Sequence, residues 1–336
     1  MSETKLNICQ VSLNRDIPLI IENFKSFKKI YNSNVKFHVI CPKNQVKEFN
    51  KKLNFKEIKV INEDELISLR KFSIIFNNLS KNIYYKEKFK KRLNWYYQQV
   101  LKISFAIKFI SLNKTNLIIW DADTIILKKI NFFNNNQSIN YGNFYEFNKN
   151  YYLTNNNILK KILKYHISFL NQFITITKKE CIHLKKNLFK KKISKEKLAE
   201  KISMLILQKI FQTHVNYDGS MFSEYELIGQ SNYMHNKSIQ KPILFLRKNL
   251  DGKLTNFQKL VSKRLNFKHV TYEHKHLGVK NKGMLKRKQS TLGFVKIILK
   301  NLFTHYVKTF FHFLKFFYYS NDLRSNRLYK EIKNKN

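Results

Sequence analysis

The chain has 336 residues, enough for one large domain or two modest ones, and 43% of them are hydrophobic, which excludes a disordered protein. Its 64 Lys and Arg residues against 22 Asp and Glu give a formal net charge of +42, which favours partners or substrates that carry phosphate, with anionic lipid and nucleic acid among them. Its three cysteines are widely spaced, which argues against disulfides and a zinc knuckle. The N-terminus is polar and lacks a signal-peptide pattern, and no run of about 18 apolar residues predicts a spanning helix. We therefore expect a cytoplasmic protein.

The N-terminal part of the chain alternates between predicted strands and helices. We expect strands at residues 6–11, 35–41 and 58–61, separated by helices at 17–31 and 46–53. This order predicts a parallel sheet with right-handed crossovers, half of a nucleotide-binding fold, although no Gly-x-Gly-x-x-Gly sequence is present. Open α/β sheets bind ligands where their strands end. We therefore expect Ser12, Asn14 and Arg15, which follow the first strand, to contact a nucleotide donor.

A second helix-forming stretch precedes the central strand. Residues 68–89 are basic and aromatic and predict loop and short helix, whereas residues 94–111 predict a long helix that Asn94 caps. Gln98 and Lys102 are four residues apart and share one face of this helix. The helix leads directly into the next strand, so that face is expected near its end. The alternative is that Gln98, Gln99 and Lys102 form the solvated side of the helix.

Residues 117–127 carry the clearest chemical signal. The apolar run 117–120 is typical of a short buried strand, and it ends in Asp121 and Asp123, followed by a second apolar run. Two carboxylates this close repel each other unless a cation lies between them, and an oxygen-rich site suits Mg²⁺ or Mn²⁺. We predict that Asp121 and Asp123 hold such a metal ion. A solvated Asp-x-Asp turn is the other interpretation.

The middle of the chain predicts further α/β elements. Residues 131–140 are an Asn-rich turn region, and residues 141–147 resemble an edge strand. The next elements are loop and helix at 151–165, a strand at 173–177, and helices at 178–189 and 193–211.

Two acidic residues stand out in the sequence Ser223-Glu224-Tyr225-Glu226. Ser223 and Glu226 have the spacing of a capping box, so Glu226 is expected to cap and Glu224 to act as a general base or to bind sugar hydroxyls. A third metal ligand could come from a histidine of the C-terminal half, yet no spacing singles out one of His214, His235, His269, His274 and His276, and a surface or core role accounts for each.

Residues 291–319 predict an amphipathic helix that is rich in aromatic residues and Lys. Such a helix can lie in a membrane interface, attracted by anionic lipid. Alternatively, it docks on the body of the protein with its Lys side chains in water. The aromatic residues exceed what one buried stripe needs, which favours the membrane surface.

Three functions are compatible with these features. In a glycosyltransferase the Asp-x-Asp pair binds a metal that grips the diphosphate of a nucleotide-sugar and stabilises the charge of the departing nucleoside diphosphate. In a haloacid-dehalogenase-type phosphatase Asp121 would be the nucleophile and Asp123 the acid, but the further acidic pair that such an enzyme needs is missing downstream. A non-enzymatic nucleic-acid binder would explain the charge, although no nucleic-acid motif is present.

The chain resembles the GT-A nucleotide-diphospho-sugar transferases. It is most similar to a poorly characterised bacterial family with Trp-x-x-Gln-Gln, Asp-Ala-Asp and Ser-Glu-Tyr-Glu in this order, here at Trp95–Gln99, Asp121–Asp123 and Ser223–Glu226. The resemblance implies that Asp121 and Asp123 hold the metal and the donor diphosphate, that Gln99 and Lys102 line the donor pocket, and that Glu224 meets a sugar.

We therefore predict an α/β, GT-A-like domain at residues 1–276, with a mostly parallel central sheet flanked by helices. A basic amphipathic helical tail is expected at residues 281–336, with an anionic membrane surface as its candidate partner. Asp123 and Glu224 are the expected catalytic residues. The expected acceptor is a glycan or a lipid-linked sugar, in the assembly of cell-surface polysaccharide or lipopolysaccharide at the cytoplasmic face of the membrane.

Overall fold

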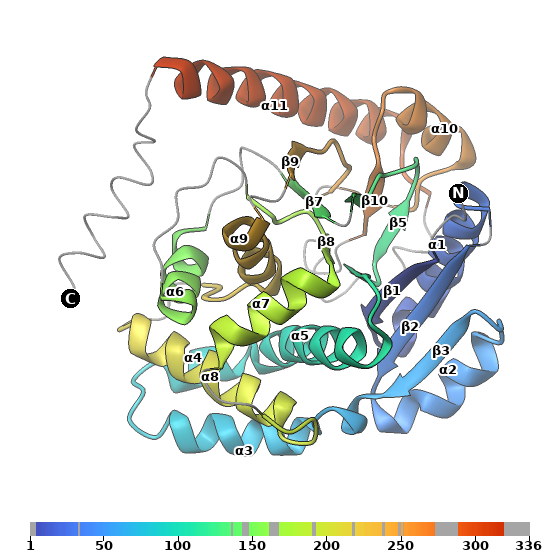
Figure 1. Cartoon of the computed structure of the whole chain (residues 1–336). Coiled ribbons are helices and arrows are strands. Elements are labelled where there is room, and N and C mark those ends of the chain that lie inside the picture. Colours follow the sequence, from blue (N-terminus) through green and yellow to red (C-terminus); the bar gives the residue numbers. More distant parts are fainter. Residues whose placement is uncertain are drawn as a thin grey trace.

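A five-stranded sheet forms the centre of the computed structural model, which describes residues 5–318 apart from 33, 136, 143–147, 161–167, 190–192, 217–218, 237–238, 248–249, 251 and 273–287. The strand order is β3–β2–β1–β4–β8 (Figure 1). The strands span β1 (Leu6–Val11), β2 (Val35–Cys41), β3 (Ile58–Asn62), β4 (Leu117–Trp120) and β8 (Phe173–Ile176). The first four are parallel and β8 is antiparallel to β4. The predicted mixed α/β fold with a mostly parallel sheet is thus confirmed.

Helices cover both faces of this sheet. On one face, Ile8 and Ile118 pack with residues of α1 (Ile17–Ile30) and α2 (Val46–Lys52). Their neighbours Cys9 and Ile119 point to the other face and pack with α5 (Leu93–Asn113). Because neighbouring strand residues alternate between two covered faces, β4 is apolar throughout, whereas β1 and β2 also bury the polar residues Gln10 and His38.

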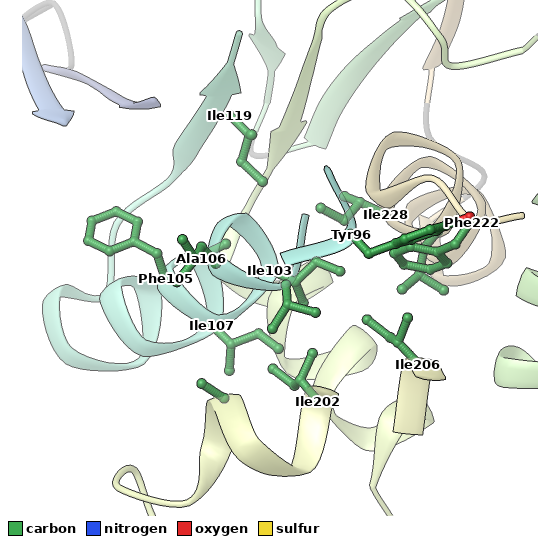
Figure 2. Close-up of a cluster of buried hydrophobic side chains, with 14 of the residues drawn as sticks. Tyr96, Ile103, Phe105, Ala106, Ile107, Ile119, Ile202, Ile206, Phe222 and Ile228 are labelled. Carbon is green, nitrogen blue, oxygen red and sulfur yellow. The ribbon is translucent and has the colours of Figure 1, made fainter. Parts of the chain in front are cut away.

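The core on the α5 face is built mainly from helices. Ile103 and Ile107 of α5 lie against Ile202 and Ile206 of α8 (Figure 2). The remaining helices of this region are α3 (Leu69–Leu79), α4 (Lys86–Lys90), α6 (Lys149–Leu159), α7 (Lys178–Leu188), α8 (Leu198–Thr213) and α9 (Glu224–Asn236). Their buried side chains fix the position of α5 and α9, the two helices that bring polar groups to the sheet edge.

Smaller elements complete the described part of the chain. Strand β5 (Thr124–Ile126) pairs antiparallel with β10 (His269–Thr271), and β7 (Gln137–Gly142) lies between β6 (Phe133–Asn134) and β9 (Ile239–Pro242). Single 3₁₀ turns η1 (Asn14–Asp16), η2 (Lys43–Gln45) and η3 (Glu63–Glu65) follow β1, β2 and β3. Helices α10 (Asn256–Arg264) and α11 (Thr291–Tyr318) come last. Among the residues described, no helix meets the length and hydropathy that crossing a bilayer requires.

Several boundaries differ from the sequence expectations. The Asn-rich stretch 131–140 contains β6 and most of β7, and β7 is a central strand of its small sheet, not an edge strand. Helix α5 begins at Leu93 with Arg92 as N-cap, because the N–H groups of Trp95 and Tyr96 already bond the Arg92 carbonyl, so Asn94 does not cap it. Helix α8 begins at Leu198, where its apolar stripe starts, and not at residue 193. Residues 143–147, 281–287 and 319–336, where parts of the predicted strand and tail fall, lie outside the described residues.

Candidate active site

A cleft of about 480 Å³ opens where β1 and β4 end. The chain runs from β1 outward to β3 and returns to β4 on the other side of β1, so these two strands flank the point where the strand order reverses. Crevices at such points are the usual ligand sites of open α/β sheets. Val11 at the end of β1, Arg15 after it, and Asp121 and Asp123 after β4 line the cleft.

The turn that carries the two aspartates is fixed by hydrogen bonds. The N–H of Thr124 donates to the carbonyl of Asp121 at 3.1 Å, and the Trp120 indole N–H donates to the carbonyl of Thr124 at 2.9 Å. The N–H of Tyr272 donates to the carbonyl of Asp123 at 2.9 Å and ties the turn to β10. Both aspartates are therefore held at the cleft by a rigid backbone.

A buried ammonium group organises the acidic side of the cleft. Lys102 Nζ lies 2.5 Å from Asp121 Oδ1 and 2.7 Å from Glu224 Oε1, and it is 3.2 Å from the Tyr225 hydroxyl. The Tyr225 hydroxyl in turn donates to Asp121 Oδ1 at 2.5 Å. Because Lys102 and Glu224 have side chains only 4% exposed, this ion pair is shielded from water.

Burial and charge determine the protonation states of this network. Burial works against the charged form of Lys102, but Asp121 and Glu224 outweigh it and raise the pKa of the ammonium above its ordinary value. Burial raises the pKa of Glu224, while Lys102 opposes that rise. Burial and the two carboxylates raise the pKa of Tyr225 well above 10, so its hydroxyl stays a hydrogen-bond donor. Glu224 is thus a buried carboxylate with an increased affinity for a proton.

The predicted site residues divide into two groups. Those that line the cleft are Arg15, Gln98, Lys102, Asp121, Asp123 and Glu224. The remaining three do not line it. Ser12 is buried and its hydroxyl donates to the carbonyl of Leu13, while the Asn14 amide donates to Glu48 on α2. Gln99 is buried behind the cleft, where its Oε1 accepts the N–H of Glu224 at 3.1 Å and so positions the start of α9.

Ser223 and Glu226 lie at the start of α9, where the sequence predicts a capping box. The N–H of Glu226 donates to Ser223 Oγ at 3.4 Å, as the Ser-x-x-Glu spacing predicts. Glu226 Oε1 accepts hydrogen bonds from the Ser168 hydroxyl at 2.6 Å and from the N–H of Phe169 at 3.1 Å. Glu226 therefore fixes the chain before β8, and Glu224 is the glutamate at the cleft.

Two arginines at the cleft were not predicted from the sequence. Arg92 lies over the Trp95 ring, 4.4 Å from its centroid, and donates to the Ser220 hydroxyl. Arg247 donates from Nε and Nη1 to Gln172, at 3.2 Å each, when the Gln172 amide is oriented to donate to Asp121 Oδ2 at 2.8 Å. A compositional signal was available: only eight of the 64 basic residues are Arg, and Arg15, Arg92 and Arg247 all line this cleft.

The acidic residues allow a test of the predicted metal. Within the described residues no three or more His, Cys, Asp or Glu side chains group as metal ligands. Mg²⁺ is, however, usually bound by one or two carboxylates together with substrate phosphates and water. Asp123 and Asp121 can supply this set, although Asp121 Oδ1 is already engaged by Lys102 and Tyr225. Lys102 offsets only one of the three carboxylates Asp121, Asp123 and Glu224, and the arginines elsewhere in the lining are available to a diphosphate that would accompany a divalent cation.

The described histidines that were candidates for a third metal ligand do not line the cleft. His214 Nε2 lies 2.8 Å from the Thr154 hydroxyl, and His235 stacks on His183 with 4.6 Å between the ring centroids. His269 is wholly buried and stacks on Phe245 at 4.8 Å. His274 and His276 lie outside the described residues.

Comparison with known proteins gives a family and likenesses to solved structures. No curated protein is matched. Among solved structures, the mannosyltransferase Ktr4p from S. cerevisiae in complex with GDP is matched at 17% identity with a TM-score of 0.24, over 38% of this chain and 36% of that chain. The match thus spans about a third of that protein's chain. The model of a family of unknown function, DUF6492, matches residues 16–241, more than half of the chain. The chain belongs to this family.

Proposed function

We propose that this protein is a glycosyltransferase that moves a sugar from a nucleoside-diphosphate donor to an acceptor hydroxyl. The observation that carries the proposal is the combination of charges in one cleft: Asp121 and Glu224 are paired with Lys102, and Asp123 lies in the same lining with Arg15, Arg92 and Arg247. A nucleotide-sugar needs both kinds of group, since its diphosphate is anionic and its reaction requires a base. The GT-A resemblance of the sequence motifs points to the same chemistry.

The arginines are suited to the donor diphosphate. Guanidinium groups bind phosphate oxygens through two parallel hydrogen bonds, and Arg92 is already oriented by its stacking on Trp95. Arg15, on the loop after β1, has a side chain that is 60% exposed and can reach a ligand that enters the cleft. These three side chains would neutralise the diphosphate and hold its bond to the sugar near Glu224.

Asp123 and Asp121 are the residues that would hold Mn²⁺ or Mg²⁺. Such an ion, when bound, stabilises the negative charge of a departing diphosphate. Lys102 and Tyr225 hold the Asp121 carboxylate in one orientation, and the turn at residues 121–124 positions Asp123 beside it. The contribution of the chain is thus a pre-oriented pair of carboxylates at the end of β4.

Glu224 is the proposed general base. The acceptor hydroxyl attacks the anomeric carbon, its proton moves to a Glu224 carboxylate oxygen, and the bond between the sugar and the β-phosphate breaks, so that its electron pair leaves with the nucleoside diphosphate. Burial raises the pKa of Glu224, which increases its affinity for that proton, and the Lys102 ammonium group opposes the rise in this pKa. We further propose a glycan or lipid-linked acceptor in the synthesis of cell-surface polysaccharide.

Release of nucleoside diphosphate tests this function. UDP-, GDP- and dTDP-sugars are incubated with the wild type, Asp123→Asn and Glu224→Gln, with Mn²⁺ or with EDTA. Asp64→Asn is the matched control, because Asp64 is an exposed aspartate after β3, away from the cleft. We expect turnover of at least one donor by the wild type and Asp64→Asn, and its loss in the two cleft variants and in EDTA. Equal turnover by all four proteins would refute the assignment of the site.

A further inference from the structure

Helix α11 has two apolar faces, and one of them packs on other residues that the structure describes, whereas the second is exposed among those residues. Phe294, Ile297 and Ile298 are buried in a cluster with Leu254, which lies before α10, and Tyr272, which follows β10, among others. In Figure 1 this helix runs along one edge of the molecule, with α10 beside its first turns. A hydrogen bond of 3.0 Å from the Gln258 amide of α10 to the carbonyl of Gln289 ties α10 to the residues just before α11. The docked face accounts for part of the aromatic and aliphatic residues of α11.

The second apolar face points to solvent. Its members are 45 to 69% exposed and are spaced by three or four residues, so they form one stripe along the helix. They are Leu292, Val295, Leu299, Phe303 and Tyr306. At 100° per residue this stripe lies opposite the docked residues Phe294, Ile297 and Ile298. Large exposed apolar patches on soluble proteins usually mark an interaction site.

Positive charge borders the exposed stripe. The sequence of α11 contains no Asp or Glu, and Lys296 and Lys300 are exposed on one flank of the stripe, each one residue beyond a stripe member. Lys288, just before the helix, is exposed as well. Helix α10, beside the first turns, adds the exposed apolar residues Phe257 and Leu260. An apolar face with Lys at its border is the pattern of helices that lie in the interface of an anionic bilayer.

We propose that the stripe Leu292–Tyr306 of α11 docks on the surface of a bilayer that contains anionic phospholipid. Charge decides between this occupant and a second copy of the chain. Two copies that met through this face would bring Lys296 and Lys300 of each close together without an acidic partner from either helix, on a protein with a net charge of +42. An anionic lipid surface instead attracts the same side chains. This inference does not depend on the proposed reaction.

Vesicle sedimentation of the full chain tests the proposal. The vesicles consist of phosphatidylcholine alone or of phosphatidylcholine mixed with phosphatidylglycerol. The test variant is Leu299→Asp with Phe303→Asp, and the control is Leu112→Asp, a comparably exposed apolar residue at the end of α5. Both test positions are exposed, so thermal unfolding of this variant should match the wild type. We expect the wild type and the control to bind the mixed vesicles, and the variant to bind at least about tenfold more weakly, as loss of two buried apolar side chains implies.

Salt and oligomeric state complete the test. Wild-type binding should weaken as salt is raised and should be much weaker on phosphatidylcholine alone, because screening removes the attraction of Lys for the anionic lipid. Equal binding of the variant and the wild type to mixed vesicles would overturn the proposal. So would a wild-type dimer in light scattering that the variant abolishes while neither protein binds vesicles, since the stripe would then be an interface between copies.

Discussion

Lys102 Nζ lies 2.7 Å from Glu224 Oε1, and this contact joins helix α5 to helix α9 across the base of the cleft. The same ammonium group lies 2.5 Å from Asp121 Oδ1, so one lysine connects two helices and the end of the central strand. It therefore has both a structural and a functional role. An ion pair this deeply buried adds little stability over an apolar replacement of both partners, but the loss of one partner leaves a buried charge without compensation.

The first prediction follows from this pairing. Replacing Lys102 with Met should lower the free energy of unfolding by about 3 kcal/mol or more, because Asp121 and Glu224 lose their cation in a dry environment. Denaturant unfolding measures this change. Adding Glu224→Gln to Lys102→Met should cost less than the sum of the two single changes, by about 1 kcal/mol or more. Strict additivity, or a Lys102→Met protein as stable as the wild type, would show that the contact is not energetically coupled.

The second prediction concerns the pH dependence of stability. Burial lowers the pKa of His269 to about 3, from 6.5 in an exposed histidine, and no hydrogen-bond partner for its ring nitrogens is found among the described residues. The unfolded chain thus binds a proton that the folded chain does not, so stability from this group is present above pH 6.5 and is lost as the pH falls toward 3. Between these two pH values, the free energy of unfolding should fall by up to about 1.4 kcal/mol per pH unit for this one histidine.

His269→Phe tests this second prediction, since a phenyl ring preserves the stacking on Phe245. Its free energy of unfolding should fall less steeply than that of the wild type as the solution is acidified below pH 6.5. His38, whose pKa burial also lowers to about 3, should leave a residual slope in both proteins. Parallel slopes in the two proteins would mean that His269 has no part in the acid sensitivity.

The third prediction concerns the arginines of the cleft. Arg92→Lys keeps the charge but removes the planar guanidinium that stacks on Trp95 and binds phosphate through paired hydrogen bonds. We expect it to weaken binding of the nucleoside diphosphate by about tenfold, the effect of losing one good charged hydrogen bond. Titration calorimetry with the product nucleotide measures this affinity. Arg70→Lys, at an exposed arginine on α3, is the matched control and should bind as the wild type does.

The sequence predicted the central sheet and about a third of the residues that line the cleft, for clear physical reasons. Strand β4 is apolar on both faces, and its abrupt end in Asp121 and Asp123 marked the carboxyl edge of the sheet. The spacing of Gln98 and Lys102 correctly placed both on one side of α5, and both line the cleft. The local pattern of apolar and polar residues was sufficient to predict these positions, because each residue is positioned by its own strand or helix.

The missed features depend on contacts between distant segments. Arg92 precedes a helix and Arg247 follows Asp121 by more than a hundred residues, so only tertiary packing brings them together. Strands β6 and β7 form in an Asn-rich stretch of low strand propensity, because β7 gains partners on both sides. Helix α11 is apolar on two faces, and its sequence pattern alone does not distinguish the docked face from the exposed one.

The central claim is that the carboxylates at the end of β4 bind a nucleotide-sugar together with a divalent cation. Titration calorimetry of UDP-, GDP- and dTDP-sugars into the wild type and Asp123→Asn, with and without Mn²⁺, measures this directly. We predict that one donor binds the wild type, that its affinity falls by about tenfold or more without Mn²⁺, and that Asp123→Asn shows the weak affinity in both conditions. Binding of no donor by the wild type, or binding that neither Mn²⁺ nor Asp123 affects, would contradict the account.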